Sequence, residues 1–216
     1  MSSTAQRDRA INIADKEFEN ALTLAHTVDS AWYRCQALGW VARYAPESEV
    51  VKVAEKAIFA AYSADDSYQV VGASAWPLRA LIERGYTQKI VNWIPKLMES
   101  PESIVNPVSR LKALDLLWQA VYPTIGPTKS LVLDKLISAC LAADSWQAGF
   151  TMREAVLVVA AESVIEANRL IASMPNGVYK RQAQRRVAEG KRGCVRSFYW
   201  GNDAVVQATW LTQQSG

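Results

Sequence analysis

Residues 32–42, "WYRCQALGWVA", return as residues 178–188, "VYKRQAQRRVA", 146 positions further along the chain. Both stretches have a Tyr, a basic residue, the pair Gln-Ala and the pair Val-Ala at the same places. An internal sequence repeat at this separation indicates a recurring structural unit. The second copy is far more basic than the first, and this difference needs its own explanation.

The apolar residues of the chain recur with the period of an α-helix. Phe18, Ala21, Leu22, Ala25 and Val28 share one helical face, for example, and no segment alternates with period two over more than a few residues. The sequence therefore predicts an all-α fold over at least residues 10–190.

Helix starts are marked by Asp, Ser or Asn residues before apolar runs, because their side-chain oxygens can accept from the free backbone N–H groups of a first turn. Five such starts are separated by 37, 40, 38 and 32 residues, at Asp29, Asp66, Asn106, Asp144 and Asn176. Another apolar helix precedes each start. The expected unit is thus a pair of antiparallel helices, and the five pairs are 14–28 with 30–44, 48–63 with 67–84, 87–99 with 107–121, 127–142 with 145–161, and 164–173 with 177–189.

One helix pair cannot bury its own apolar face, whereas pairs stacked side by side form a continuous core. We therefore expect an α-α superhelix, a short solenoid of about five pairs. The expected organisation is an N-terminal extension at 1–13, a single α-helical repeat domain at 14–190, and a basic and aromatic C-terminal segment at 191–216.

The same offset of 146 residues also aligns the first helices of the first and last pairs, so that small residues match small ones and large residues match large ones. The matches are Ala21 with Ala167, Leu24 with Leu170 and Val28 with Met174. In this period and pattern the chain resembles the HEAT-like and TPR-like helical repeat families. It departs from the TPR pattern because the Leu-Gly of "QALGW" does not recur and the spacing exceeds 34 residues. The HEAT-like resemblance implies a right-handed superhelix whose second helices line a concave surface used for binding proteins or nucleic acids.

Composition narrows the class of protein. The chain has 216 residues with a net charge of +3, its N-terminus lacks the apolar run of a secretory signal, and no apolar run approaches the roughly 18 residues needed to span a bilayer. Three isolated cysteines favour a reducing compartment. We expect a cytoplasmic protein without a membrane partner.

Catalytic and metal-binding motifs are missing from the sequence. A single histidine, His26, and no C-x-x-C pair make a metal site improbable, and the ten glycines are scattered rather than gathered in a phosphate-binding loop. No Ser or Cys nucleophile has a base beside it in a recognisable motif. We therefore predict no catalytic residues, no metal, no cofactor and no enzymatic activity.

Positive charge gathers at the C-terminal end. Residues 176–216 contain seven basic side chains and only two acidic ones. The basic residues include Lys180, Arg181, Arg185 and Arg186. A terminal repeat needs a polar outer face to stop further stacking. Arginine side chains also bind phosphates and acidic protein surfaces, so a cap and a binding surface are both open interpretations.

The second helices carry further candidates for the concave surface. Arg34, Arg110 and Lys180 correspond to one another by offsets of 76 and 146, and form either a ladder of basic side chains facing a partner or solvated and ion-paired residues. The full set of predicted partner-binding residues is Arg34, Trp40, Arg79, Arg110, Trp118, Arg153, Lys180, Arg181, Arg185 and Arg186. The eight tryptophans are expected mainly to fill gaps between stacked helices.

Two functions fit this sequence. The first is a non-catalytic α-solenoid scaffold or adaptor that binds a protein partner, with acidic character, through its concave surface and basic end. The alternative is a helical-repeat protein that binds nucleic acid, including a DNA-repair enzyme of the helical-repeat type. The net charge of only +3 favours the first.

Overall fold

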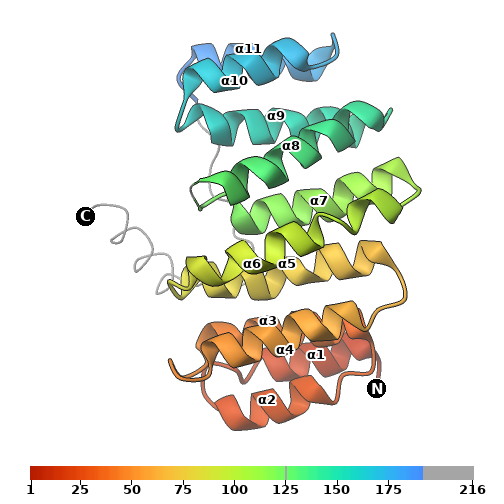
Figure 1. Ribbon diagram of the computed structural model, residues 1–216, viewed down its shortest axis with the longest axis vertical. Helices are drawn as coiled ribbons and strands as arrows, with labels where there is room; N and C mark the ends of the chain where they lie inside the picture. Colours follow the sequence, from red (N-terminus) through yellow and green to blue (C-terminus); the bar gives the residue numbers. More distant parts are fainter. Residues whose placement is uncertain (125, 192–216) are drawn as a thin grey trace. The chain divides into compact units, whose positions relative to one another are not determined.

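The computed structural model describes residues 1–124 and 126–191, and every regular element within them is a helix (Figure 1). The helices are α1 (Ser3–Ile11), α2 (Phe18–His26), α3 (Ala31–Tyr44), α4 (Val50–Tyr62), α5 (Ser67–Glu83), α6 (Thr87–Leu97), the short 3-10 helix η1 (Pro101–Ser103), α7 (Pro107–Val121), α8 (Pro127–Ala142), α9 (Trp146–Ala160), α10 (Val164–Ser173) and α11 (Val178–Ala188). The predicted all-α fold is confirmed.

Each of the ten helices expected from the sequence is present, as α2 to α11. One additional helix, α1, occupies the stretch expected to be an N-terminal extension. Its first turn is capped by Ser2, whose hydroxyl accepts from the backbone N–H of Ala5, and its last residues Ala10 and Ile11 are buried. Of the predicted C-terminal segment 191–216, only Lys191 lies among the described residues.

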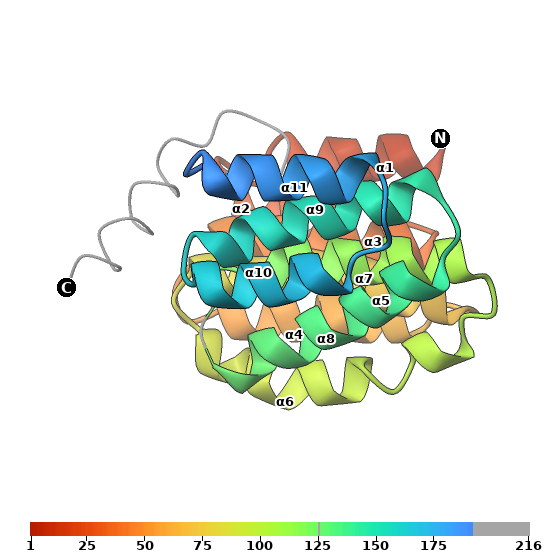
Figure 2. The same cartoon turned by 90° about the horizontal axis from the view of Figure 1, so that it is seen from above.

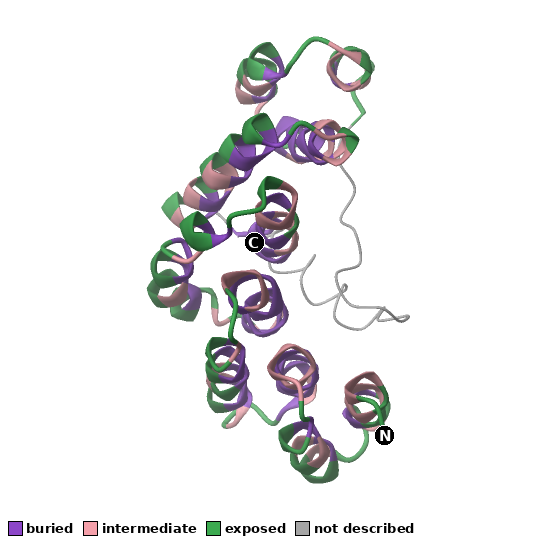
Figure 3. Ribbon diagram, turned by 90° about the vertical axis from the view of Figure 1, so that its right-hand side faces the viewer, coloured by how far each residue is buried: buried purple, intermediate pink, exposed green. Residues whose placement is uncertain are grey.

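The described residues group into two compact units. The first contains residues 1–65 and 73–93, and the second contains residues 66–72, 94–124 and 126–191. Both α5 and α6 contribute residues to each unit. Within each unit, buried residues lie on the helix sides that face neighbouring helices (Figure 3). The stacking of all five pairs into one solenoid stays a prediction.

In the first unit, α3 is the central helix, since every residue from Cys35 to Arg43 is buried. Gly39 brings α3 close to α5, because a Cβ atom placed on it would lie 2.8 Å from the backbone nitrogen of Pro77. Near the ends of the same two helices, Glu83 accepts from Arg43 Nε at 2.6 Å and from Arg79 Nε at 2.8 Å. Close backbone approach and a buried ion cluster thus join α3 to α5.

In the second unit, α9 is the most buried helix, and it packs against α7, α8, α10 and α11. The views in Figure 1 and Figure 2 agree that α10 and α11 lie side by side next to α9. Four leucines on α7 and α8 are almost wholly buried, namely Leu111, Leu114, Leu117 and Leu136. Each contributes about 1.5–3 kcal/mol by removing its side chain from water.

Candidate functional site

The basic residues predicted to form a ladder each donate to a backbone carbonyl just before their own helix, and Arg34 Nη2 also donates to Ser63 Oγ after α4 at 3.2 Å. Arg34 Nη1 donates to Val28 O at 3.2 Å, Arg110 Nη2 donates to Ile104 O at 2.8 Å, and Lys180 Nζ donates to Met174 O at 2.9 Å. Each acceptor lies six residues before the donor, where the preceding helical segment ends. The three residues occupy corresponding positions in the sequence because each one fastens the connection that precedes its helix. These helices are α3, α7 and α11.

Four other predicted surface residues lie in the interior. Trp40, Arg79, Trp118 and Arg153 are only 5%, 5%, 3% and 8% exposed. The two tryptophans fill space between helices, and the two arginines are held by carboxylates, Arg79 by Glu83 and Arg153 by Glu154. We therefore exclude these four from direct contact with a partner.

The three arginines on α11 remain accessible. Arg185 Nε lies 3.8 Å from Glu189 and Arg186 Nη1 lies 3.8 Å from Glu154, distances at which exposed ion pairs contribute little. Arg181 is exposed and has no ion pair with any residue in the described part of the chain.

The position of these arginines in the repeat explains the charge of the second copy. By the offset of 146 residues they correspond to Cys35, Gly39 and Trp40 of α3, all of them buried. The Cys35 thiol donates to Ala73 O in α5 at 3.2 Å, and Gly39 meets the backbone of α5. The surface of α3 that packs against α5 thus corresponds, on α11, to a surface that carries arginines.

Trp146 departs from the expected role of the tryptophans, because 65% of its surface is exposed. It is the first residue of α9, where the Ser145 hydroxyl caps the helix by accepting from Ala148 N. Two cavities of about 380 Å³ each have Trp146 in their walls. We call Trp146 together with these two cavities the Trp146 site.

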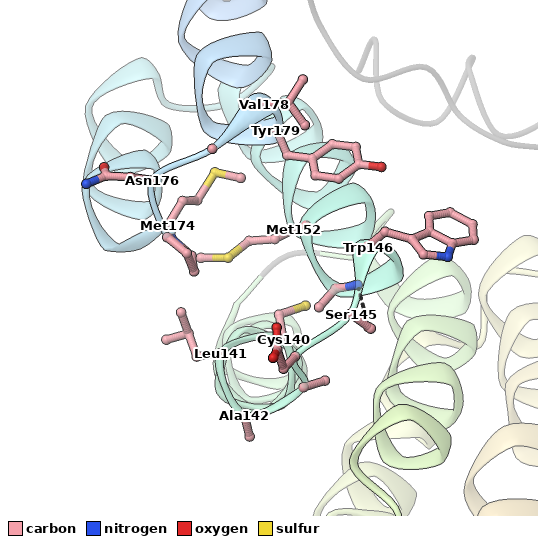
Figure 4. Close-up of a pocket in the computed structure, with 16 residues that line it drawn as sticks. Cys140, Leu141, Ala142, Ser145, Trp146, Met152, Met174, Asn176, Val178 and Tyr179 are labelled. Atoms are coloured by element: carbon pink, nitrogen blue, oxygen red, sulfur yellow. Dashed lines mark hydrogen bonds between the residues drawn. The ribbon is translucent and has the colours of Figure 1, made fainter.

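The first cavity, the α8–α11 cavity, lies between the end of α8, the start of α9 and the start of α11 (Figure 4). Its wall includes the side chains of Met152, Met174, Val178 and Tyr179. Cys140 also lines it, and burial raises the pKa of the Cys140 thiol to about 12, with a smaller contribution from the charge of Asp115. The cavity therefore presents sulfur and carbon atoms together with the polar residues Asp144, Ser145 and Asn176, and its thiol is neutral at physiological pH.

The second cavity, the α7–α9 cavity, lies between α7 and α9. Its wall includes Phe150 and Trp146 from α9, and Lys112 and Asp115 from α7. Lys112 is exposed, and no carboxylate among the described residues pairs with it. A largely apolar recess with Lys112 and Asp115 in its wall accommodates an apolar side chain.

A buried arginine stands behind the two cavities. Arg153 Nε and Nη2 lie 2.8 and 2.6 Å from Glu154 Oε1, and Arg153 Nη1 donates to Gln182 Oε1 on α11 at 2.5 Å. Its guanidinium carbon lies 5.6 Å from the centre of the Tyr179 ring. We call Arg153, Glu154, Tyr179 and Gln182 the Arg153 cluster.

The same cluster occurs 146 residues earlier. Arg7 Nε and Nη2 lie 2.8 and 2.7 Å from Asp8 Oδ1, Nη1 donates to Gln36 Oε1 at 2.9 Å, and the guanidinium carbon lies 5.1 Å from the centre of the Tyr33 ring. This Arg7 cluster fastens α1 to α3 as the Arg153 cluster fastens α9 to α11. Helices α1 to α3 and α9 to α11 are therefore two copies of one three-helix module.

Sequence reasoning missed Arg7, Asp8, Lys112 and the exposure of Trp146. The two cluster residues were within reach, because extending the 146-residue comparison upstream pairs "RD" at 7–8 with "RE" at 153–154. The sequence contains no such signal for Lys112 and Trp146. Whether a side chain at the border of a helix's apolar face is exposed depends on which neighbouring helices pack over it.

The described residues contain neither a candidate metal-binding cluster nor a helix that could span a membrane. No group of three or more His, Cys, Asp or Glu side chains there is placed to hold a metal ion. No helix in this part of the chain combines the length and apolar character required to cross a membrane. Comparison of the chain with protein-family models, with curated proteins and with solved structures gives no match.

Proposed function

We propose that the chain is a non-catalytic binding protein whose Trp146 site takes a short acidic segment of a partner protein carrying two apolar side chains. The observation that carries this proposal is the exposed Trp146 ring with a cavity on each side. Large aromatic side chains at such places are typical anchors of protein interfaces. A segment lying across Trp146 places one apolar side chain in each cavity.

An acidic partner is proposed because two cations near the site have no ion pair in the described part of the chain, although each cavity wall also holds an aspartate, Asp144 in the first and Asp115 in the second. Lys112 lines the α7–α9 cavity, and Arg181 lies one helical turn beyond Val178, a wall residue of the α8–α11 cavity. Neither cation has an ion pair among the described residues. Carboxylates in the bound segment would supply the missing partners and would also speed association.

The site also agrees with the expected architecture. Its residues come largely from α7, α9 and α11, which are second helices of their pairs, the helices that line the binding surface in HEAT-like proteins. We propose an α-solenoid adaptor on this basis.

The first test uses fluorescein-labelled peptides in which two leucines, separated by two, three or four residues, lie in a background of Glu and Ser. Fluorescence anisotropy is expected to show saturable binding that Trp146→Ala weakens tenfold or more, which corresponds to at least about 1.4 kcal/mol. Phe59→Ala is the matched control, because Phe59 is an aromatic residue of the other unit that is 62% exposed. It is expected to leave the affinity unchanged.

Charge is tested with Lys112→Glu, which is expected to weaken the same peptides several-fold and to reduce the salt dependence of binding. Lys16→Glu makes the same change of charge at an exposed position outside the site. The proposal is wrong if none of the peptides binds, or if binding is indifferent to Trp146. Oligonucleotides that bind more tightly than the peptides, with a steep salt dependence, would favour the nucleic-acid alternative instead.

A further inference from the structure

Arg153 connects the walls of the two cavities although it is itself buried. Its guanidinium carbon lies 4.7 Å from the centre of the Phe150 ring and 5.6 Å from the centre of the Tyr179 ring. Phe150 lines the α7–α9 cavity and Tyr179 lines the α8–α11 cavity. One guanidinium therefore supports one ring in each wall.

We infer that Arg153 is the positioning residue of the Trp146 site, holding Phe150 and Tyr179 in the orientations that keep both cavities open. This inference rests on the proposed function for its binding consequences. With only 8% of its surface exposed, Arg153 acts on a bound segment through the two rings. A partly desolvated guanidinium attracts the face of an aromatic ring, and Glu154 and Gln182 fix the guanidinium in turn.

Gly149 supports the same arrangement. A Cβ atom on Gly149 would overlap the Tyr179 ring, so the ring lies directly against the backbone of α9. The Tyr179 ring is thereby held between the Gly149 backbone and the Arg153 guanidinium. Both contacts restrict the ring before any ligand arrives, and a restricted wall binds with a smaller loss of side-chain entropy.

Comparison with the Arg7 cluster shows which contacts of Arg153 fasten helices and which contacts position the site. The Arg7 cluster has the same hydrogen bonds and the same Arg-Tyr contact, but Thr4 stands at the place of Phe150. The Arg–Tyr contact and its hydrogen bonds therefore fasten a three-helix module in both copies, whereas the Phe150 ring of the α7–α9 cavity has no counterpart in the first copy.

The matched variants Arg153→Leu and Arg7→Leu test this inference. Both are expected to lower the urea midpoint of unfolding by similar amounts, because each removes the same set of bonds. Only Arg153→Leu is expected to weaken the acidic peptides, by ~10-fold. Equal affinities of Arg153→Leu and wild type for the peptides would overturn the inference.

A second readout needs no ligand. The ¹³C-methyl signals of Met152 and Met174 report on the α8–α11 cavity, because both side chains line it beside Tyr179 and Trp146. Arg153→Leu is expected to shift these signals, and Arg7→Leu is expected to leave them in place. If the wild type binds no peptide, the proposed function fails while this readout still tests the positioning role. Unshifted signals in Arg153→Leu would overturn it.

The milder variant Gln182→Leu guards against loss of folding. It removes the acceptor of Arg153 Nη1 and leaves the ion pair with Glu154. The Met152 and Met174 signals are expected to shift in the same direction as in Arg153→Leu, by a smaller amount. The control Gln36→Leu makes the equivalent change in the Arg7 cluster, and is expected to leave these signals in place.

Discussion

Arg34, Arg110 and Lys180 each place a positive charge against a backbone carbonyl at the end of the preceding helical segment. Carbonyl groups at such ends have no partner within their own helix, and their dipoles favour a nearby cation. The long basic side chain supplies hydrogen bonds and charge together. A basic residue that the sequence suggests as a partner-binding residue thus stabilises the connection between two helices.

Arg110 offers the clearest test of this role, since both Nε and Nη2 donate to Ile104 O, at 3.1 and 2.8 Å. Arg110→Met keeps most of the aliphatic stem and removes both donors. We expect it to lower the free energy of unfolding by about 1.5–3 kcal/mol, measured by urea denaturation. Arg169→Met is the control, because Arg169 is a highly exposed arginine whose ion pair within the described residues is with Glu166, three residues away. A loss no larger than the control's would contradict the fastening role.

Helix caps show how far single residues could be predicted. Asp66 and Asn106 accept from backbone N–H groups three residues later, as the sequence indicated. At the α9 start the prediction of Asp144 was wrong, because Ser145 caps the helix, and at the α11 start Gly177 holds the cap position instead of Asn176. Neighbouring Asp, Asn and Ser residues are equally good caps, so only the backbone path decides between them.

At the scale of helices, the close contact between α3 and α5 depends on Gly39. The nearest atoms to an added Cβ would be the backbone nitrogen of Pro77 and the Cβ of Trp76, at 2.8 and 2.9 Å. Neither atom belongs to the flexible end of a side chain. The helices would therefore have to move apart to admit even a methyl group.

Gly39→Ala is accordingly expected to destabilise the protein by about 2 kcal/mol, although alanine in an open helix is favoured over glycine by about 1 kcal/mol. Gly177→Ala serves as the matched change, because a Cβ there meets nothing within 4 Å and its φ of 166° is extended backbone. Chemical denaturation of both variants measures the difference. A stabilised Gly39→Ala would show that the two helices do not approach this closely.

Helix positions were largely predictable, whereas the role of α1 was not. The ten helices α2 to α11 have apolar stripes or clear caps and breakers around them. Helix α1 has only two buried residues, Ala10 and Ile11, so its apolar face is too short to stand out in the sequence. It becomes visible only through its match to α9, centred on Arg7 and Arg153.

At the scale of the whole molecule, the described residues of each unit include one buried cysteine. Cys35 lies in the first unit and Cys140 in the second, and burial raises the pKa of both thiols above the ordinary value. With a pKa of about 12, on the order of 10⁻⁴ of Cys140 is thiolate at pH 8. Reaction with a thiol reagent therefore reports on opening of each unit.

We expect both thiols to be protected in the native state and to become reactive over the same range of urea concentration, in a Cys194→Ser background. The reason is that α5 and α6 each contribute residues to both units, so that unfolding of one unit breaks helices of the other. Mass spectrometry of the labelled peptides separates the two sites. Labelling of Cys140 well before Cys35, or the reverse, would mean that the units unfold independently.

The arginine at position 185, where the first copy has Gly39, limits how the chain can be extended by protein engineering. A longer array made by grafting a copy of α4 and α5 after Ala188 would force the backbone of the new helix onto the Arg185 side chain. Restoring glycine at 185, together with cysteine at 181 and tryptophan at 186, is the smallest set of changes that would recreate the acceptor side of α3. Without these changes, we expect a grafted helix pair not to pack against α11.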